Sequence, residues 1–253
     1  MAVGNLALVG SGEYTLEMLS LESELIESGR RNNKEKVFVQ FATAAGLESK
    51  ESIEYWRTLG AEQAQRIGVE QKFIEVFNRE DATDSKWIKE IEGASLIYFS
   101  GGNPKHLAET LKGTLLWEKI ISEFKTGSSL AGCSAGAMMM GSDIAFPVLR
   151  KNHVSTGLAL ISKLAVLPHY DRYFGKIPNL VQNLMFNRNH EIRVIGIDEN
   201  TALVRENGSW KCQGLGKVHV ISEKPSKIFG NKDRKSTRLN SSHEWISRMP
   251  SSA

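Results

Sequence analysis

Cysteine is scarce in this chain: Cys133 and Cys212 are the two among 253 residues. Two cysteines supply neither a disulfide framework nor the closely spaced ligands of a zinc site, which fits a reducing compartment. Long apolar runs are absent as well, since no stretch approaches the roughly 18 residues of a membrane span. The first residues also lack the basic segment of a signal peptide. We therefore expect a cytoplasmic protein.

A large excess of charge of one sign is also missing. The formal net charge is +3, and residues 233–253 contribute +2 of it through four basic and two acidic side chains. Residues 233–243 and 247–253 correspond to the translation of a common sequencing-library adapter. We expect residues 233–253 to be an artefactual tail and residues 1–232 to form one domain, with the true C-terminus after Lys232 missing. The near-neutral remainder gives no reason to expect nucleic acid or a membrane as a partner.

Short apolar runs alternate with amphipathic segments through the first half of the chain. Predicted strands cover residues 5–10, 36–42, 73–77, 94–99 and 129–132, and predicted helices cover residues 16–30, 52–67, 85–91, 105–111 and 115–126. Such alternation predicts an α/β fold with a mostly parallel sheet and helices on both faces. In these folds, ligands bind beyond the carboxyl ends of the strands.

The end of the chain reads as a series of strands. We predict strands at residues 193–197 and 201–204, an antiparallel hairpin of residues 209–212 and 217–221 around Gly214 and Gly216, and a further strand from Lys227. Near the N-terminus, Gly10-Ser11-Gly12 lacks the third glycine of a dinucleotide fingerprint, which argues against nucleotide binding there.

The most informative stretch is Gly132-Cys133-Ser134-Ala135-Gly136. An apolar run enters it and a helix-favouring run of methionines leaves it, which is the order of a nucleophile elbow. The turn would hold Ser134 at a positive φ and lift its hydroxyl above the sheet, while the flanking glycines let strand and helix pack closely. Small residues also occur at ordinary strand-to-helix turns, so the motif alone is a modest signal.

A second glycine loop, Gly101-Gly102-Asn103-Pro104, follows the strand predicted just before the elbow strand. We expect this loop and Ser134 to emerge at the same edge of the sheet. Paired glycines let backbone N–H groups approach a ligand closely, which suits an oxyanion donor. A plain turn before a helix that begins with proline is the alternative.

A serine nucleophile needs a base and an orienting acid. His169 ends an apolar run and is the preferred base; His153 is the second choice, and the other histidines read as solvated or structural. The acid comes from the turn Asp198-Glu199-Asn200, where Glu199 is preferred and Asp198 is nearly as plausible. A solvated turn between two strands is the alternative interpretation.

These segments together resemble peptidase family S51. The resemblance rests on Gly101-Gly102-Asn103, on Gly132 to Ala137, on Pro168-His169 and on Gly196 to Leu203, and it covers nearly all of residues 5–221. The family includes aspartyl dipeptidase and cyanophycinase and has the flavodoxin-like three-layer sandwich of the class I glutamine amidotransferase-like proteins. The resemblance therefore implies that fold here.

By that resemblance Ser134 is the nucleophile, His169 the base and Glu199 the acid, with the N–H groups of Gly102 and Ala135 as the oxyanion hole. It implies hydrolysis of small aspartyl peptides through an acyl-enzyme, with no metal or cofactor. The partner is then a small peptide substrate, and the oligomeric state stays open, with a homodimer as one option.

The chain departs from both named members at the glycine loop. Cyanophycinases carry Gly-Gly-Asp-Gln and aspartyl dipeptidases Gly-Asn-Thr where this chain has Gly102-Asn103-Pro104. Asn103 and Arg172 are candidates to hold a substrate carboxylate, although Arg172 could equally form a surface salt bridge. Two other functions stay open: a non-catalytic amidotransferase-like binding or regulatory protein, and a glutaminase that uses Cys133.

Overall fold

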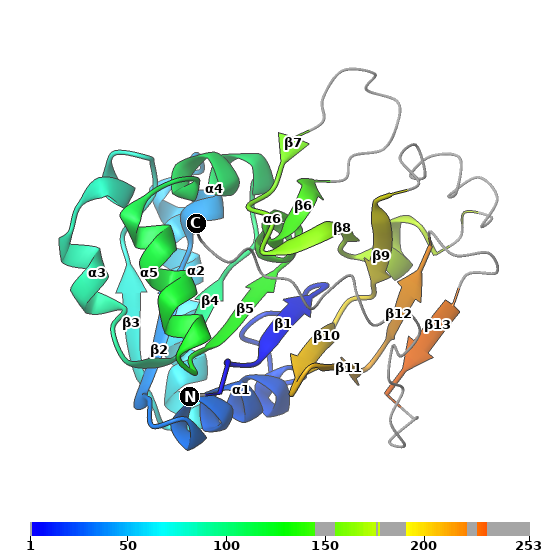
Figure 1. The fold of residues 1–253 in the computed structure, drawn as a ribbon, viewed down its shortest axis with the longest axis horizontal. Coiled ribbons are helices and arrows are strands. Elements are labelled where there is room, and N and C mark those ends of the chain that lie inside the picture. Colours follow the sequence, from blue (N-terminus) through cyan, green and yellow to red (C-terminus); the bar gives the residue numbers. More distant parts are fainter. Residues whose placement is uncertain (1, 145–154, 176, 178–190, 222–226, 232–253) are drawn as a thin grey trace.

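A computed structural model describes residues 2–144, 155–175, 177, 191–221 and 227–231 (Figure 1). Within these ranges the main sheet has seven strands in the order β11-β10-β1-β5-β4-β2-β3. β1, β5, β4, β2 and β3 run parallel, and β10 and β11 continue the sheet antiparallel. The bounds are β1 Leu6–Val9, β2 Glu35–Phe41, β3 Glu70–Ile74, β4 Ala94–Phe99, β5 Ser129–Cys133, β10 Thr201–Glu206 and β11 Ser209–Gly214.

Helices cover both faces of the main sheet (Figure 1). Successive strand side chains point to opposite faces, so Leu6 and Leu8 pack in one apolar core while Ala7 and Val9 pack in the other. The second core lies under α1 and α2, and the first lies under α3 to α6. The bounds are α1 Leu19–Arg31, α2 Lys50–Ile67, α3 Lys86–Glu90, α4 Pro104–Leu111, α5 Leu115–Lys125 and α6 Ala135–Met140. The predicted layered α/β fold is confirmed.

A second sheet adjoins the first. In the described residues it has six strands in the order β13-β12-β9-β8-β6-β7, of which β6, β8 and β9 run parallel. Its bounds are β6 Gly141–Ile144, β7 Ser155–Thr156, β8 Ile161–Leu167, β9 Arg193–Ile197, β12 Lys217–Val220 and β13 Lys227–Gly230, and the short helix α7 Tyr170–Tyr173 follows β8. The sequence pattern did not predict this division into two sheets.

The predicted hairpin around Gly214 and Gly216 is wrong. β11 pairs with β10, whereas β12 pairs with β9 in the other sheet. The residues that connect β11 to β12 lie against the turn that follows β9. The N–H of Leu215 donates to the carbonyl of Asn200, and the N–H of Gly216 donates to Thr201 Oγ1 at 2.8 Å. A Cβ on Gly214 would lie 2.3 Å from that Asn200 carbonyl. The glycines therefore let the chain cross between sheets instead of reversing within one.

Two further predicted strands, at residues 73–77 and from Lys227, can be compared with the structure. The sequence predicts the third strand at residues 73–77, but β3 spans Glu70–Ile74. β3 is an edge strand paired only with β2, so polar residues in it stay partly exposed and the apolar pattern that marks a strand is weak there. The strand predicted from Lys227 is confirmed as β13. His153, His190 and the expected tail at residues 233–253 lie outside the described residues, and the single domain stays a prediction.

The core under α1 and α2 contains a buried acid that predicts how stability depends on pH. Glu22 is 2% exposed, and burial raises its pKa from 4.5 to about 8 even though it accepts hydrogen bonds from Tyr14 N–H and Gln63. Between these two values the folded protein holds a proton that the unfolded chain has released. The contribution of Glu22 to the free energy of unfolding should therefore be greatest below pH 4.5, fall as the pH rises, and level off above about 8.

Replacing Glu22 with glutamine should remove this slope. From urea unfolding at pH 5, 7 and 9, we expect the wild type to lose roughly 2–4 kcal/mol more stability across that range than Glu22→Gln does. Parallel pH profiles for the two proteins would contradict the assignment of the slope to Glu22.

Candidate active site

The elbow predicted around Ser134 is present as strand, tight turn and helix. β5 ends at Cys133, α6 begins at Ala135, and Ser134 between them has φ 48° and ψ −106°. A Cβ on Gly132 would lie 2.4 Å from the carbonyl carbon of Gly136, so glycine is needed where strand and helix cross. Ser134 N–H donates to the carbonyl of Val9 at 2.9 Å, which fixes the turn to the end of β1.

Two side chains from the second sheet extend a chain of hydrogen bonds from Ser134. His169 follows β8 and Glu199 follows β9, and these strands are parallel neighbours whose carboxyl ends meet at one edge. The Nε2 atom of His169 lies 3.2 Å from Ser134 Oγ, and its Nδ1 lies 2.9 Å from Glu199 Oε1. The structure thus brings these three predicted residues together.

The partners of the imidazole decide its tautomer. A carboxylate only accepts, so Nδ1 of His169 carries the proton that is donated to Glu199. The lone pair of Nε2 is then left facing the Ser134 hydroxyl. The hydrogen bond from His169, aided by the nearby Arg172 charge, lowers the pKa of Glu199. Glu199 is therefore ionised at neutral pH and can stabilise an imidazolium.

Asp198, the other acid considered, belongs to a different cluster. Its Oδ1 lies 2.9 Å from Nε2 of His219, and its Oδ2 accepts the N–H of Lys217 at 2.8 Å. The His219 ring also packs against Tyr170 in a tilted arrangement, with ring centroids 4.3 Å apart. Asp198 therefore connects β9 to β12, and its carboxylate is not bonded to His169.

The glycine loop lies beside the elbow, as the order of the strands predicted. A Cβ on Gly101 would lie 3.6 Å from Ser134 Cβ and 3.9 Å from the Trp56 ring. Gly102 has φ 133°, and a Cβ there would lie 2.5 Å from the Ala44 carbonyl oxygen. Gly102 therefore leaves no room for a side chain, whereas a Cβ on Gly101 would be tight only against the Glu13 carboxyl group. The oxyanion donors predicted at Gly102 and Ala135 are thus on the two segments that meet at Ser134, and their role stays a prediction.

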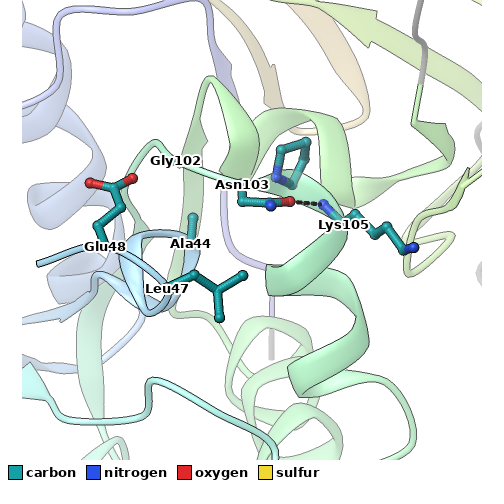
Figure 2. A pocket seen from close by; sticks show the side chains of 7 residues that line it. Ala44, Leu47, Glu48, Gly102, Asn103 and Lys105 are labelled. Carbon is teal, nitrogen blue, oxygen red and sulfur yellow. Dashed lines mark hydrogen bonds between the residues drawn. The ribbon is translucent and has the colours of Figure 1, made fainter.

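A pocket of about 580 Å³ opens next to this loop (Figure 2). Its lining consists of Ala44, Leu47, Glu48, Gly102, Asn103, Pro104 and Lys105. Oδ1 of Asn103 accepts the N–H groups of Lys105 and His106 and so caps α4. The part of Asn103 that can donate to a ligand is therefore its NH₂ group.

The two predicted carboxylate-binding residues lie in different surroundings. Asn103 lines the pocket, whereas the Arg172 side chain is 65% exposed and its Nη1 lies 3.5 Å from Glu199 Oε1. Arg172 therefore already forms the salt bridge that was its alternative role. Its contact with Glu199 still keeps the guanidinium at the margin of the His169 site.

Cys133 lies under the elbow instead of at its surface. It is fully buried, and its Sγ–H donates to Glu13 Oε2 at 2.7 Å. Burial, reinforced by the nearby Glu13 charge, raises the pKa of this thiol well above its ordinary value. An inaccessible, protonated thiol is a poor nucleophile, which argues against a glutaminase that uses Cys133.

Two residues near the site were missed by the sequence reasoning. Glu13 accepts the N–H of Gly101 at 2.9 Å, and Trp56 packs beside that glycine. Glu13 lies in the loop that was considered only as an incomplete nucleotide fingerprint. The signal available there was a carboxyl group four residues after the end of the buried strand β1.

The described residues contain no group of three or more His, Cys, Asp or Glu side chains placed to hold a metal ion. Among the helices in the same ranges, none combines the length and apolar character needed to cross a membrane.

Comparison with known proteins agrees with this architecture. Residues 6–212 match the family model described as Peptidase family S51. Among solved structures, a peptidase from an acI-B1 Actinobacterium is 41% identical, with a TM-score of 0.82 over 90% of this chain and 94% of that one. A candidate peptidase E protein from Listeria monocytogenes is 20% identical, with a TM-score of 0.61 over 85% and 100% of the two chains, and this likeness supports the fold alone.

Among curated proteins, a cyanophycinase of Trichormus variabilis is 28% identical over 185 residues, which cover 70% of this chain. The match spans 58% of that relative's length. The family model matches well over half of this chain, and the strand order and the Ser134 elbow are features of the structure itself. The chain belongs to peptidase family S51.

Proposed function

We propose that this protein is a serine-type exopeptidase that hydrolyses small aspartyl peptides through an acyl-enzyme. The observation that carries the proposal is the continuous line of hydrogen bonds from Ser134 Oγ through the His169 ring to Glu199. In this arrangement Nε2 of His169 faces the Ser134 hydroxyl and Nδ1 faces a carboxylate, which is the order of contacts that a serine nucleophile requires. Membership of family S51 supports the same reaction class.

The reaction would proceed in two halves. Ser134 Oγ attacks the peptide carbonyl carbon while His169 Nε2 accepts the hydroxyl proton, and Glu199 stabilises the resulting imidazolium. The N–H groups of Gly102 and Ala135 would hold the developing oxyanion. His169 then passes the proton to the leaving amine, and the C–N bond breaks. Water, deprotonated by the same imidazole, attacks the ester and releases the acid and Ser134.

Two features of the surroundings support an acidic small substrate. Asn103 lines the pocket beside the glycine loop, with its Oδ1 occupied by the α4 cap, and the Arg172 guanidinium lies at the margin of the His169 site. Both are donors that can pair with a carboxylate. Gly102 lines the pocket, and a Cβ on the adjacent Gly101 would lie 3.6 Å from Ser134 Cβ, so a substrate of few residues suits this arrangement.

A fluorophosphonate label and a dipeptide panel would test the proposal together. We expect the label to attach to Ser134 by mass spectrometry, and we expect Asp-Leu or β-Asp-Arg to be hydrolysed faster than Ala-Leu. The Ser134→Ala protein is the matched control and should show neither reaction. Labelling without dipeptide turnover would indicate another acyl substrate. If neither reaction occurred, the non-catalytic binding protein would become the better hypothesis.

A further inference from the structure

Glu13 is a buried carboxyl group that contacts both segments of the candidate active site. It lies in the loop between β1 and α1 and is only 7% exposed. Its Oε1 accepts the N–H of Gly101 at 2.9 Å, and its Oε2 accepts the thiol of Cys133 at 2.7 Å. One carboxyl group therefore joins the glycine loop after β4 to the last residue of β5.

The contact with Gly101 completes the anchoring of the glycine loop. Ser100 N–H donates to the Phe41 carbonyl at 2.9 Å, and Asn103 N–H donates to the Ala44 carbonyl at 2.8 Å. With Gly101 held by Glu13, the backbone is fixed on both sides of Gly102. The direction of the Gly102 N–H bond thus depends on these neighbours, since glycine has no side chain that limits its own rotation.

The contact with Cys133 fixes the distance to the nucleophile. Cys133 directly precedes Ser134, whose own N–H is held by Val9 at the end of β1. A Cβ on Gly101 would lie 3.1 Å from Glu13 Oε1 and 3.6 Å from Ser134 Cβ, so the three residues are in close contact. Loss of the carboxyl group would free the loop to move relative to the serine.

We propose that Glu13 is a positioning residue that holds the Gly101–Gly102 loop at the correct distance from Ser134. It touches no substrate; it acts through the backbone that carries the oxyanion donor. Donors of an oxyanion hole act only when placed within hydrogen-bond reach of the developing charge. The inference rests on the proposed serine hydrolysis. The experiment below distinguishes a failure of the Glu13 role from a failure of the proposed hydrolysis.

Three variants of the full chain test this role: Glu13→Ala, Glu13→Gln and, as the matched control, Glu22→Gln. Glu22 is also a buried carboxyl group of the same core, but it binds Tyr14 N–H and Gln63 instead of the glycine loop. The measurements are the second-order rate of fluorophosphonate labelling and the kcat and KM for Asp-Leu. Both reactions place an oxygen in the oxyanion hole.

We expect Glu13→Ala to lower the labelling rate and kcat by about 10- to 100-fold while KM changes by less than about threefold. Glu13→Gln keeps an acceptor for the Gly101 N–H and should stay within about fivefold of the wild type, as should Glu22→Gln. An unchanged rate in Glu13→Ala would overturn the proposal. An equal loss in Glu13→Gln, or a rise in KM that accounts for the loss, would do the same.

If Glu13→Ala fails to fold, the role of Glu13 can still be tested by hydrogen exchange of the Gly101 amide in the wild type. Slow exchange, retained in Glu13→Gln, supports the anchored loop, and exchange as fast as that of an exposed amide overturns it. Absence of labelling in the wild type would instead contradict the proposed function. The Gly101 exchange would then still decide whether Glu13 holds the loop.

Discussion

Replacing His169 with alanine is expected to lower kcat for the best dipeptide by about 10⁵-fold, and Ser134→Ala should cost a similar factor. The reason is that Nε2 of His169, 3.2 Å from Ser134 Oγ, is the group placed to accept the hydroxyl proton. Without the imidazole the serine hydroxyl is a weak nucleophile at neutral pH.

The double variant gives the sharper result. Because the two residues act in one step, the protein that carries both substitutions should be no slower than either single variant, to within about threefold. Steady-state kinetics on freshly purified protein, with unfolding midpoints compared, would check this. Losses that multiply in the double variant would mean that Ser134 and His169 act independently, contrary to the proposed mechanism.

The second large effect is expected for the acid. Glu199→Gln should lower kcat by about 10³- to 10⁴-fold, because an amide at 2.9 Å from Nδ1 can favour the wrong imidazole tautomer and no longer stabilises the imidazolium. The expected change in KM is small. Measurement of kcat and KM across pH 5 to 9 would show the low activity at every pH.

Asp198→Asn is the matched control, since the two acids are adjacent and the sequence makes Asp198 nearly as plausible as Glu199. Asp198 binds His219 and the N–H of Lys217, so its loss should lower stability by roughly 1–3 kcal/mol while kcat stays within about tenfold of the wild type. If Asp198→Asn instead lost activity as severely as Glu199→Gln, the assignment of the acid to Glu199 would fail.

Local sequence predicted the elements around the site because their signals are short-range. The strand, tight turn and helix at Ser134 follow from glycines at 132 and 136, which make a close crossing sterically feasible. The Asn103 cap and the proline after it begin α4 where the pattern placed a helix. Such features depend on neighbours in the chain and on side-chain volume.

Other aspects depended on residues distant in sequence. The sequence predicted strands at 193–197 and 201–204 with a turn between them, but it did not predict that β9 and β10 belong to different sheets. The sequence of an apolar strand does not specify which strand it pairs with, because the backbone hydrogen bonds are the same in either sheet. The separation of β11 from β12 was missed for the same reason.

The sequence by itself determined the layered α/β fold, the elbow at Ser134 and a short set of residues able to serve it, because apolar periodicity and glycine sterics are properties of the local chain. Only the tertiary structure decided that Glu199 faces His169 while Asp198 faces His219, and that Glu13 reaches both Gly101 and Cys133. Adjacent side chains in a turn point in different directions, and their partners come from strands that are brought together only by folding.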